Sequence, residues 1–385
     1  MPLLRCYTAR DTGSLAPNHC ALSTRDGRLL LGQDGLLSFD GETWVALPIP
    51  EGHTVRSLAE DDTGRVWVAG DGLLGYLSVT AEGGPLFVSV LDRLIPEQRN
   101  IGVVSAVFAL PQNTVVAVTE NRVIRLQASG VHVWSLPAPR PLSAWRDNDG
   151  TIFIAQPETA TLRMGEAGLE PAGFPEPFAQ AGIEWRVRFP DGRSLCGAGG
   201  QCIAVNADGW ARVDGPTSAA LSQDRTTGGV ALAGGFAAIA TQRHGILIVD
   251  SSGQPVTALD QSSGLPSNRI VHLAADPASS CLTITTNDGV AVLCGELLAS
   301  FFDNRHGLHH KRIQAIARGP GGLFAATDEA TYRLETRRGT ITNLPGQWSP
   351  QPGPLANIKQ LLLLPDRLLG IGADGLSLVD AKQTS

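Results

Sequence analysis

Short apolar runs recur along the chain at a nearly fixed spacing. The stretch from Gly264 to Leu308 shows one complete unit, because its opening pattern Gly-Leu-Pro-Ser-Asn-Arg-Ile begins again 43 residues later as Gly-Leu-His-His-Lys-Arg-Ile. Four apolar runs of strand length lie in this unit, and Gly, Pro, Asn and Asp separate them. Four strands in about 40 to 45 residues are typical of one propeller blade.

The same template fits the chain nine times. It predicts blades that begin near residues 19, 54, 103, 142, 183, 229, 269, 312 and 358. The sixth unit has a second candidate inner strand at residues 218–223, which leaves eight blades as the alternative count. Many runs, such as Leu361–Leu364, are apolar on consecutive residues, as expected of strands that a neighbouring blade covers on each face. The runs are too short to be helices.

The two ends of the chain complement each other. The ninth unit contains only three strand-length runs, and the chain begins with a lone apolar run at residues 3–8. If this N-terminal strand completes the last blade, the ring closes without an unpaired sheet edge. The predicted fold is therefore all-β, a single closed β-propeller of four-stranded antiparallel blades that occupies residues 1–385 as one domain.

Composition agrees with many short strands and narrows the possible partners. The chain has 44 Gly and 25 Pro, a high content of turn residues. Its net charge is −7 and it has no Lys/Arg-rich run, which argues against nucleic acid as a partner. The N-terminus lacks the pattern of a signal peptide, and no apolar run of about 18 residues occurs. We therefore expect no membrane insertion and a cytoplasmic location, with a periplasmic one as the alternative if an export signal has been removed.

Six cysteines give an even count without a metal-binding spacing. Cys196 and Cys202 flank one turn, and Cys281 and Cys294 lie on adjacent strands of one hairpin, so either pair is a candidate disulfide. Cross-strand neighbours rarely have the geometry that a disulfide needs, and cysteine is often a small buried apolar residue. The expectation is therefore reduced, buried thiols.

Two motifs resemble the two-component regulator propeller repeat. One is Gly-Leu-Pro-Ser-Asn at residues 264–268, and the other is Leu-Ala-Glu-Asp-Asp-Thr-Gly-Arg-Val-Trp-Val-Ala-Gly-Asp-Gly-Leu at residues 58–73. The resemblance implies the sensor portion of a bacterial signalling protein, often periplasmic, that recognises a carbohydrate or another small ligand. The chain lacks the further domains of that family, so it is expected to be either an excised sensor or a free-standing propeller.

The candidate binding site lies on one face of the predicted disc. The loops that enter the inner strands and the turns between second and third strands are expected to surround the mouth of the central channel. Three of the eight histidines fall in one such loop. The predicted ligand-binding residues are the polar residues of units six to eight: Arg243, His244, Asn268, Arg269, Asp303, Arg305, His306, His309, His310 and Asp328.

These residues predict binding of a small polar ligand, with carbohydrate as one class, and a plain solvated loop is the alternative. A metal would need the histidines to converge with a carboxylate such as Asp303, and adjacent His309 and His310 tend to point apart. We therefore expect no metal and no cofactor. Second-to-third turns carry several acids, among them Asp34, Asp71 and Glu120. These acids either form an acidic crown or are ordinary hairpin-turn residues.

No catalytic motif appears in the sequence, so no catalytic residue is predicted. A protein-interaction scaffold that uses the broad face of the disc is the alternative function. The third is a propeller lyase or hydrolase, in which His272, His306 and Arg305 would form a general acid/base set.

Overall fold

Antiparallel strands make up most of the regular structure. The computed structural model describes residues 3–14, 17–139, 143–147, 149–156, 159–165, 167–174, 182–206, 209–222, 224–276, 281–294, 312–319, 322–327, 329–335, 347–350, 358–363, 367–372 and 375–380. The chain divides into two compact units, Leu4–Leu293 and a smaller one that comprises Met1–Leu3 and Cys294–Ser385.

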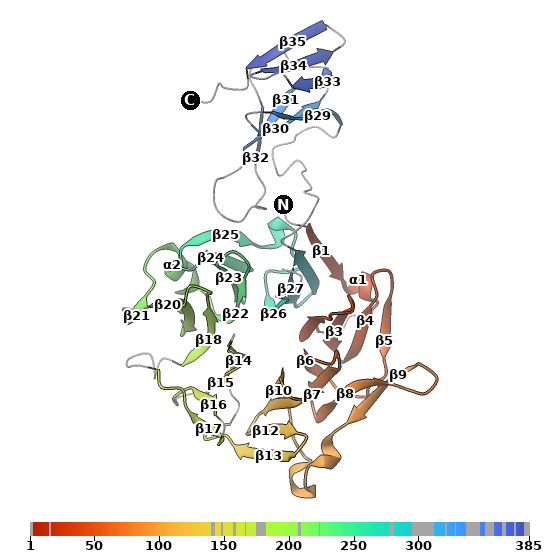
Figure 1. The fold of residues 1–385 in the computed structure, drawn as a ribbon, viewed down its shortest axis with the longest axis vertical. Coiled ribbons are helices and arrows are strands. Elements are labelled where there is room, and N and C mark those ends of the chain that lie inside the picture. The colour runs from red at the N-terminus through yellow and green to blue at the C-terminus, as the bar shows by residue number, and fades with distance from the viewer. Residues whose placement is uncertain are drawn as a thin grey trace. The chain divides into compact units, whose positions relative to one another are not determined.

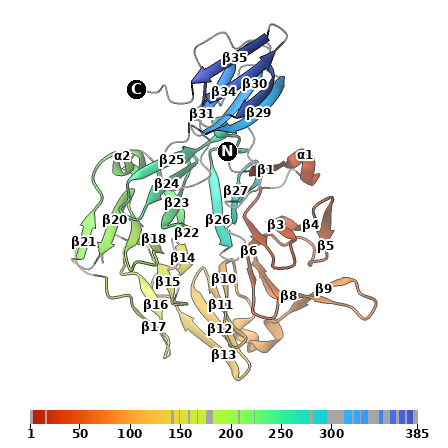
Figure 2. The ribbon, with the colours of Figure 1, turned by 45° about the horizontal axis from the view of Figure 1, so that its top comes forward.

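The larger unit contains seven four-stranded sheets, called blades 1 to 7 below (Figures 1 and 2). Blades 1 to 3 consist of β2 (Cys20–Ser23), β3 (Leu29–Gln33), β4 (Gly35–Phe39) and β5 (Trp44–Leu47); β6 (Val55–Glu60), β7 (Val66–Gly70), β8 (Leu73–Val79) and β9 (Pro85–Ser89); β10 (Val104–Leu110), β11 (Thr114–Thr119), β12 (Arg122–Gln127) and β13 (Gly130–Ser135).

Blades 4 to 6 follow the same order from inner to outer strand. They consist of β14 (Ser143–Arg146), β15 (Ile152–Ala155), β16 (Leu162–Met164) and β17 (Leu169–Pro171); β18 (Ile183–Arg188), β19 (Ser194–Ala198), β20 (Gln201–Asn206) and β21 (Gly209–Arg212); β22 (Thr226–Leu232), β23 (Phe236–Thr241), β24 (Ile246–Asp250) and β25 (Pro255–Leu259). Blade 7 consists of β26 (Ile270–Asp276), β27 (Cys281–Thr286), β28 (Gly289–Cys294) and β1 (Leu3–Thr8).

The seven blades form a closed ring. Each inner strand contacts the inner strand of the next blade, and β26 of blade 7 contacts β2 of blade 1. Side chains join the same two blades: the hydroxyls of Ser23 and Thr283 lie 2.8 Å apart, and the Asn18 amide donates to the carbonyl of Thr286 at 3.2 Å. The larger unit is therefore a seven-bladed propeller.

The N-terminal strand closes this ring on a different blade from the one expected. It was predicted to complete the last sheet of the chain, whereas β1 is the outer strand of blade 7, next to β28. Side-chain contacts explain this position. Tyr7 packs against Phe39 and Trp44 of blade 1, with ring centroids 4.7 Å and 5.5 Å apart, and the Cys6 thiol donates to the carbonyl of Gly264.

The second strands of the blades form the core. Strands β3, β7, β11, β15, β19 and β23 are buried at every position, which confirms the interpretation of consecutive apolar residues. Packing at one end of β7 is so close that a Cβ at Gly70 would lie 1.8 Å from the carbonyl oxygen of Thr54. The sequence places Gly there because no side chain fits.

In the sixth unit, the later of the two candidate inner strands is the one that the structure contains. Its inner strand is β22, and Pro216–Ser222 forms the short helix α2. The alternative strand at residues 218–223 is therefore wrong. The remaining helical segments are α1 (Ala9–Thr12) and the 3-10 turns η1 (Leu91–Arg93), η2 (Pro96–Gln98) and η3 (Gln261–Ser263). No helix within the described part of the chain is long and apolar enough to cross a membrane.

The smaller unit contains two more sheets, so the all-β class and the nine sheets are confirmed. Sheet 8 has the order β29 (Ile313–Gly319), β30 (Gly322–Thr327), β31 (Thr331–Glu335) and β32 (Gln347–Pro350). Sheet 9 has three strands, β33 (Ile358–Leu363), β34 (Arg367–Gly372) and β35 (Gly375–Asp380). The two sheets pack together through Phe324, Ala326 and Ile358.

The cysteines differ from expectation at one residue. Cys196 and Cys202 are free and buried, as predicted. In the β19–β20 ladder, Cys202 lies opposite Gly197 and not opposite Cys196, so the two thiols point to different faces of the sheet. Cys281 is disulfide-bonded, which corrects the expectation of reduced thiols throughout. It lies at the first position of β27 and is half-buried, whereas the free thiols of Cys196 and Cys202 are buried.

Candidate functional site

Recurring β-bulges shape the channel end of the inner strands. Five of the seven inner strands of the ring, β6, β10, β18, β22 and β26, shift register after their first residue. A bulge leaves one residue unpaired and turns its side chain out of the regular alternation. The extra residues are Arg56, Ser105, Glu184, Thr227 and Val271. Four of the five are polar, so the fold places polar groups where the inner strands begin.

Two of the bulge residues, Arg56 and Ser105, line a cavity of about 260 Å³ in the ring. Its walls are β6, β10 and β14, and His272 of β26 reaches it from blade 7. We call this cavity the channel. Its polar lining residues are Arg56, Ser57, Glu60, Ser105, Arg146 and His272, and its apolar ones include Leu58, Val107 and Phe108.

Arg56 belongs to a network of charges from blades 1 to 3. Its guanidinium forms an ion pair with Asp71, in which Nη2 lies 2.9 Å from Oδ2. Hydrogen bonding from Arg56 holds the pKa of the Asp71 carboxyl below its usual value. The hydrogen bond to Asp71 contributes most to the raised pKa of Arg56, and the charges of Asp34 and Glu120 raise it further. The expected acidic turns therefore surround a basic residue, whose single positive charge offsets part of their negative charge.

His19 adds a titratable group to this network. Burial lowers its pKa first, and the charge of Arg56 lowers it further, while Asp34 and Asp71 oppose the shift. The imidazole of His19 is therefore neutral at neutral pH.

Arg146 differs from Arg56 in having no acidic partner. Its Nη1 donates to the carbonyl of Ala109 at 2.8 Å, and it makes no ion pair with any described carboxylate. Glu60, the acid that lines the same channel, accepts a hydrogen bond from the backbone N–H of Arg25 at 2.9 Å and lies 3.7 Å from the Arg25 side chain. The channel thus contains one guanidinium whose charge the described protein leaves unpaired.

His272 enters the channel from the opposite side. Its ring is exposed to the cavity, yet the blades enclose it, and this enclosure lowers its pKa to about 4. The imidazole is therefore neutral above about pH 5 and can accept or donate one hydrogen bond at each ring nitrogen. No hydrogen bond from a described residue fixes its tautomer.

The structure describes four of the ten residues that the sequence predicted for the site. Asp303, Arg305, His306, His309, His310 and Asp328 lie outside the described residues. Arg243, His244, Asn268 and Arg269 come together, because the N–H of Gly245 donates to the carbonyl of Asn268 at 2.9 Å and joins the blade 6 turn to the loop before blade 7. None of the four lines the channel.

Two of these four residues mainly hold turns in place. Asp224 accepts hydrogen bonds from the backbone of Arg243 at 2.8 Å and from the His244 ring at 2.9 Å. Burial alone would raise the pKa of Asp224, but the His244 bond and its neighbours lower it. The Asn268 side chain accepts from the backbone of Gln261 at 2.7 Å. The guanidinium groups of Arg243 and Arg269 are exposed and make no hydrogen bond to the described residues.

Sequence reasoning missed Arg56, Ser105 and Arg146 as channel residues. A bulge leaves no mark in a single sequence, and Arg146 lies at the end of an ordinary apolar strand. The available signal was the position of polar residues at equivalent places of the inner strands. Elsewhere, the part of the chain that the structure describes contains no group of three or more His, Cys, Asp or Glu residues that could hold a metal ion.

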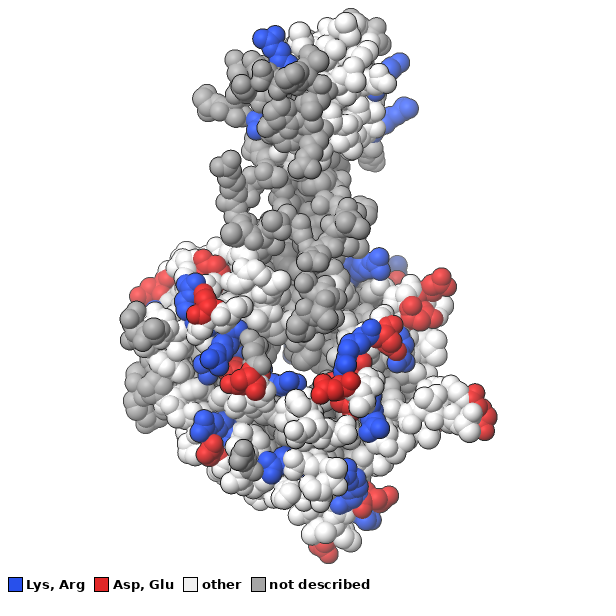
Figure 3. All heavy atoms as spheres, in the orientation of Figure 1, with Lys and Arg blue, Asp and Glu red and all other residues white. Residues whose placement is uncertain are grey.

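Acidic and basic side chains are interspersed over the face of the molecule drawn in Figure 3. Among the coloured residues there, neither sign forms a large continuous area. This distribution does not resemble the basic stripe that tracks nucleic-acid phosphates.

A scan against models of protein families finds no match, and a search of curated proteins finds none either. Solved structures do match. Virginiamycin B lyase from Staphylococcus aureus has a TM-score of 0.58 at 14% identity over 76% of this chain and 99% of the lyase. The extracellular domain of the hybrid two-component system BT3049 from B. thetaiotaomicron has a TM-score of 0.62 at 14% identity over 100% of this chain.

The present chain covers 54% of that BT3049 domain, about half its length. YCF48 bound to D1 peptide has a TM-score of 0.60 at 14% identity over 78% of this chain and 97% of YCF48. At these identities the likeness shows the β-propeller fold alone.

Proposed function

We propose that the protein is a non-catalytic, sensor-type propeller that binds a small polar ligand in the channel. A carbohydrate that carries an anionic group is the favoured ligand class. The observation that carries this proposal is Arg146, a channel guanidinium without a carboxylate partner among the described residues. Guanidinium groups bind carboxylates and phosphates by paired hydrogen bonds, so an anionic ligand group would supply the partner that the protein does not.

The other channel groups suit the hydroxyl-bearing body of such a ligand. The neutral ring of His272 can donate and accept. The hydroxyl of Ser105 donates to the carbonyl of Val118 at 3.2 Å and can accept from a ligand, and Glu60 adds carboxylate acceptors. A cavity of about 260 Å³ lies just below the usual range for drug-sized ligands, which limits the ligand to a small molecule. This placement moves the proposed ligand from the loops of units six to eight into the channel.

The absence of catalysis is part of the proposal. A general base in a hydrolase or lyase is oriented by a further group, as in the catalytic triad. His272 has no such hydrogen-bonded partner among the described residues, and the charged channel residues Glu60 and Arg56 are held by Arg25 and Asp71. Virginiamycin B lyase shares the propeller fold, so product analysis belongs in the test.

A location outside the cytoplasm fits this function better than the cytoplasmic one predicted from the N-terminus. Disulfides persist in oxidising compartments, and Cys281 is disulfide-bonded. The two-component neighbours are extracellular domains. We therefore propose the periplasm or the cell exterior.

The test is a thermal-shift screen of the full chain against D-glucuronate, D-galacturonate, D-glucose and citrate, with chromatography of each incubated ligand. A ligand that binds the native state raises the melting temperature by mass action. We expect the uronates to stabilise the wild type and to be recovered intact. The shift is expected to disappear in Arg146→Ala and to persist in Arg212→Ala, an exposed arginine on β21. Chemical conversion of a uronate would show that the protein is an enzyme and not a sensor. Thermal shifts that are unchanged in Arg146→Ala would exclude the channel as the binding site.

A protein-interaction scaffold is the second candidate, and the smaller unit favours it. Leu362, Leu369 and Leu378 lie side by side across the three strands of sheet 9. Leu362, Leu376 and Leu378 are 48%, 70% and 58% exposed. An apolar sheet face of this kind is typical of a surface that packs against another protein. We expect Leu376→Ser with Leu378→Ser to abolish any self-association or co-purifying partner, seen by light scattering, while uronate binding is unchanged.

A further inference from the structure

The smaller unit resembles two consecutive propeller blades, drawn in blue in Figures 1 and 2. Phe324 and Ala326 of sheet 8 pack against Ile358 of sheet 9, and Ala317 and Leu361 of the two inner strands join this contact. We call the face of each sheet that is directed as Phe324 is the forward face, and the face directed as Ile358 is the rear face. The contact therefore uses the forward face of sheet 8 and the rear face of sheet 9.

The rear face of sheet 8 can be identified from equivalent positions in the two sheets. Both inner strands shift register after their first residue, Ile313 in β29 and Ile358 in β33. Counted from these residues along the two ladders, Ile316 is the counterpart of Leu361. Ile313 and Ile316 therefore lie on the rear face of sheet 8, as Ile358 and Leu361 do on that of sheet 9.

The two rear faces carry similar residues but differ in cover. Ile358 is 2% exposed in its contact with sheet 8, whereas its counterpart Ile313 is 42% exposed. Ile316 is 60% exposed, although Leu361 at the equivalent position is partly buried against the same contact. Sheet 8 thus has the apolar rear face of a blade without another blade packed on it.

The forward face of sheet 9 is apolar and exposed as well. Leu362 and Leu369 are the counterparts of Ala317 and Phe324, so they lie on this face. Leu378 of β35 lies opposite Leu369 in the ladder and extends the face to the third strand. Leu362 and Leu378 are exposed. The smaller unit therefore has an open apolar face at each end, and the two faces are of the two kinds that pack together between sheets 8 and 9.

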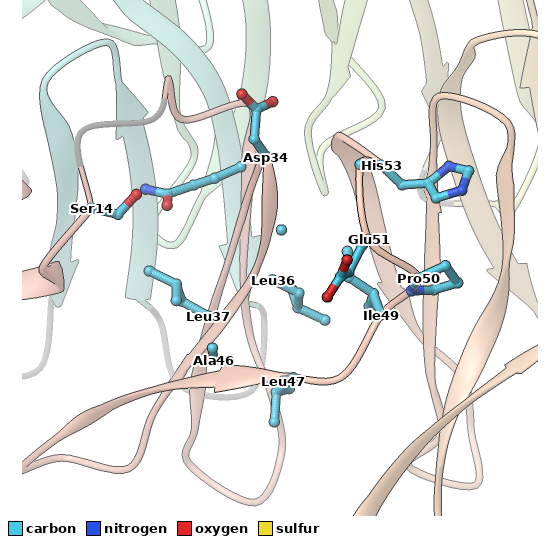
Figure 4. A pocket seen from close by; sticks show the side chains of 13 residues that line it. Ser14, Asp34, Leu36, Leu37, Ala46, Leu47, Ile49, Pro50, Glu51 and His53 are labelled. Atoms are coloured by element: carbon cyan, nitrogen blue, oxygen red, sulfur yellow. The ribbon is translucent and has the colours of Figure 1, made fainter.

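The described blades of the larger unit leave no comparable face open. Each blade contacts the one before it and the one after it, and β26 closes on β2. Between blade 1 and the connection to blade 2 there is a cavity lined by Leu36, Leu47 and Ile49 among other residues (Figure 4). Its volume is about 310 Å³, which is the size of a small-molecule site and too small for a blade. A blade face that matches sheet 8 or sheet 9 is therefore found on another smaller unit.

We propose that the smaller unit is an assembly module, in which the forward face of sheet 9 packs on the rear face of sheet 8 of a second copy of the chain. This interface repeats between copies the contact that sheets 8 and 9 make within each copy. It names the partner for the apolar face that the scaffold candidate uses, and it does not depend on the ligand of the channel.

The number of copies follows from blade geometry. A head-to-tail contact generates a closed ring when its rotation divides a full turn. Propellers typically close with four to eight blades, and seven blades of this chain already form one ring. Because each copy contributes two sheets, the nearest even numbers are six and eight. The composite ring therefore contains three or four copies.

The first test is the mass of the full chain in solution, measured by light scattering after size-exclusion chromatography. We expect three or four times the mass of one chain. A monomer or a dimer would overturn the ring. Uronate titration of the same sample keeps the two proposals apart, because an assembled protein that binds no uronate contradicts the channel proposal alone.

Two variants test the head-to-tail arrangement. Ile316→Lys blocks the rear face of sheet 8, and Leu378→Lys blocks the forward face of sheet 9, because a lysine buried in an apolar interface costs free energy. Both side chains are exposed within the chain, so both variants are expected to fold. Each variant alone should be monomeric. An equal mixture should give a heterodimer and nothing larger, because it retains one intact face of each kind.

The matched control is Val79→Lys, which places a lysine at an exposed apolar residue of β8 in the larger unit and should keep the mass of the wild type. Association of Ile316→Lys alone would show that forward faces pack on each other and would overturn the head-to-tail contact. A mixture of Ile316→Lys and Leu378→Lys that remains monomeric, with both variants folded by circular dichroism, would overturn it as well.

Discussion

Blades 2 and 4 enter their first hairpin through the same pattern, an Asp followed three residues later by Gly. The backbone turns are alike: the N–H of Gly64 donates to the carbonyl of Asp61 at 3.0 Å, and the N–H of Gly150 donates to that of Asp147 at 2.9 Å. The carboxylates are treated differently. Asp61 accepts from the backbone of Thr63 and Arg65 and from the indole of Trp67, at 2.9, 3.1 and 3.0 Å.

Asp147 is turned toward blade 5. Its Oδ2 lies 3.5 Å from Nη1 of Arg186, and its Oδ1 is buried without a hydrogen-bond partner. The position that corresponds to Trp67 is Phe153, which has no N–H to offer. Burial raises the pKa of Asp147 although Arg186 opposes the shift, whereas the hydrogen bonds of Asp61 outweigh burial and lower its pKa.

The same contrast extends to the whole of the two blades. Four of the buried side-chain atoms without a hydrogen-bond partner belong to blade 4, on Trp145, Asp147, Gln156 and Thr161, and blade 2 has none within its described residues. Each blade also directs one arginine to the channel, Arg56 with a carboxylate partner and Arg146 without one. Natural proteins leave polar groups uncompensated mainly at functional sites. We infer that blade 2 mainly supports the ring and that blade 4 supports binding.

The largest expected effect separates the two aspartates. Asp61→Asn replaces an acceptor oxygen by a donor amide, so at least one of its hydrogen bonds is lost and one buried donor is left unpaired. We expect the free energy of unfolding to fall by about 2 to 3 kcal/mol. The pKa of Asp147 is raised in spite of Arg186, so its ionised form opposes folding at neutral pH, and Asp147→Asn should change the free energy of unfolding by no more than about 1 kcal/mol. Urea unfolding of both variants tests this, and equal losses would break the comparison.

Trp67→Phe gives blade 2 the residue type that blade 4 has at the corresponding position, Phe153. Asp61 loses its indole donor, and the smaller ring leaves space in the core. We expect a loss of about 1 to 2 kcal/mol in the free energy of unfolding. The control is Trp67→Phe in the Asp61→Asn background, where the indole bond is already weakened. Full additivity of the two losses would show that the bond contributes nothing.

The pH dependence of the same variants should have opposite signs. The folded pKa of Asp61 lies below the unfolded value near 3.9, so its contribution is complete above that value and is lost as the pH falls through the folded pKa. The folded pKa of Asp147 lies above 3.9, so its ionised form destabilises at neutral pH, and this cost disappears on acidification.

Relative to Asp147→Asn, the wild type should therefore gain stability between pH 7 and pH 4. Relative to Asp61→Asn, it should lose stability below pH 4. Urea unfolding at each pH measures both differences, and two differences of the same sign would contradict the opposed environments of the carboxylates.

The smallest expected effect concerns the two arginines. The Arg56–Asp71 pair is about one-third exposed, so solvent screens it and Arg56→Ala should cost only about 0.5 to 1 kcal/mol. Arg146→Ala removes no ion pair and should change stability by less than about 0.5 kcal/mol. Thermal unfolding of both variants makes this comparison. A larger loss for Arg146→Ala would assign Arg146 a structural role instead.

The sequence predicted the all-β class and the positions of the blade strands because a blade is specified by local features. The inner strands begin at Cys20, Val55, Val104, Ser143, Ile183, Thr226, Ile270, Ile313 and Ile358, within three residues of the predicted starts. The ring closure was missed because pairing between distant strands depends on contacts such as Tyr7 with Phe39, which no local pattern encodes. Consecutive apolar residues were also taken to mean that both faces of a strand are covered. In sheet 9 one face is exposed at Leu362, Leu376 and Leu378.

The predicted site residues that the structure describes are not the residues that line the channel. Loop composition led to polar residues such as His244 and Asn268, whose side chains bond to Asp224 and to the backbone of Gln261. The channel residues depend on bulges and on which blades face each other, and both arise only in the closed ring. Asp61 and Asp147 show the same limit. Their shared sequence pattern predicts the same turn, but it does not predict that their carboxylates lie in opposite environments.

The central claim is that the channel binds an anionic polar ligand through Arg146. Calorimetric titration of the full chain with D-glucuronate, in the wild type, Arg146→Ala and Arg212→Ala, tests it most directly. The account predicts that the wild type and Arg212→Ala bind with the same affinity and that Arg146→Ala binds at least tenfold more weakly. Equal affinities in all three proteins, or no binding by the wild type to any anionic sugar, would contradict it.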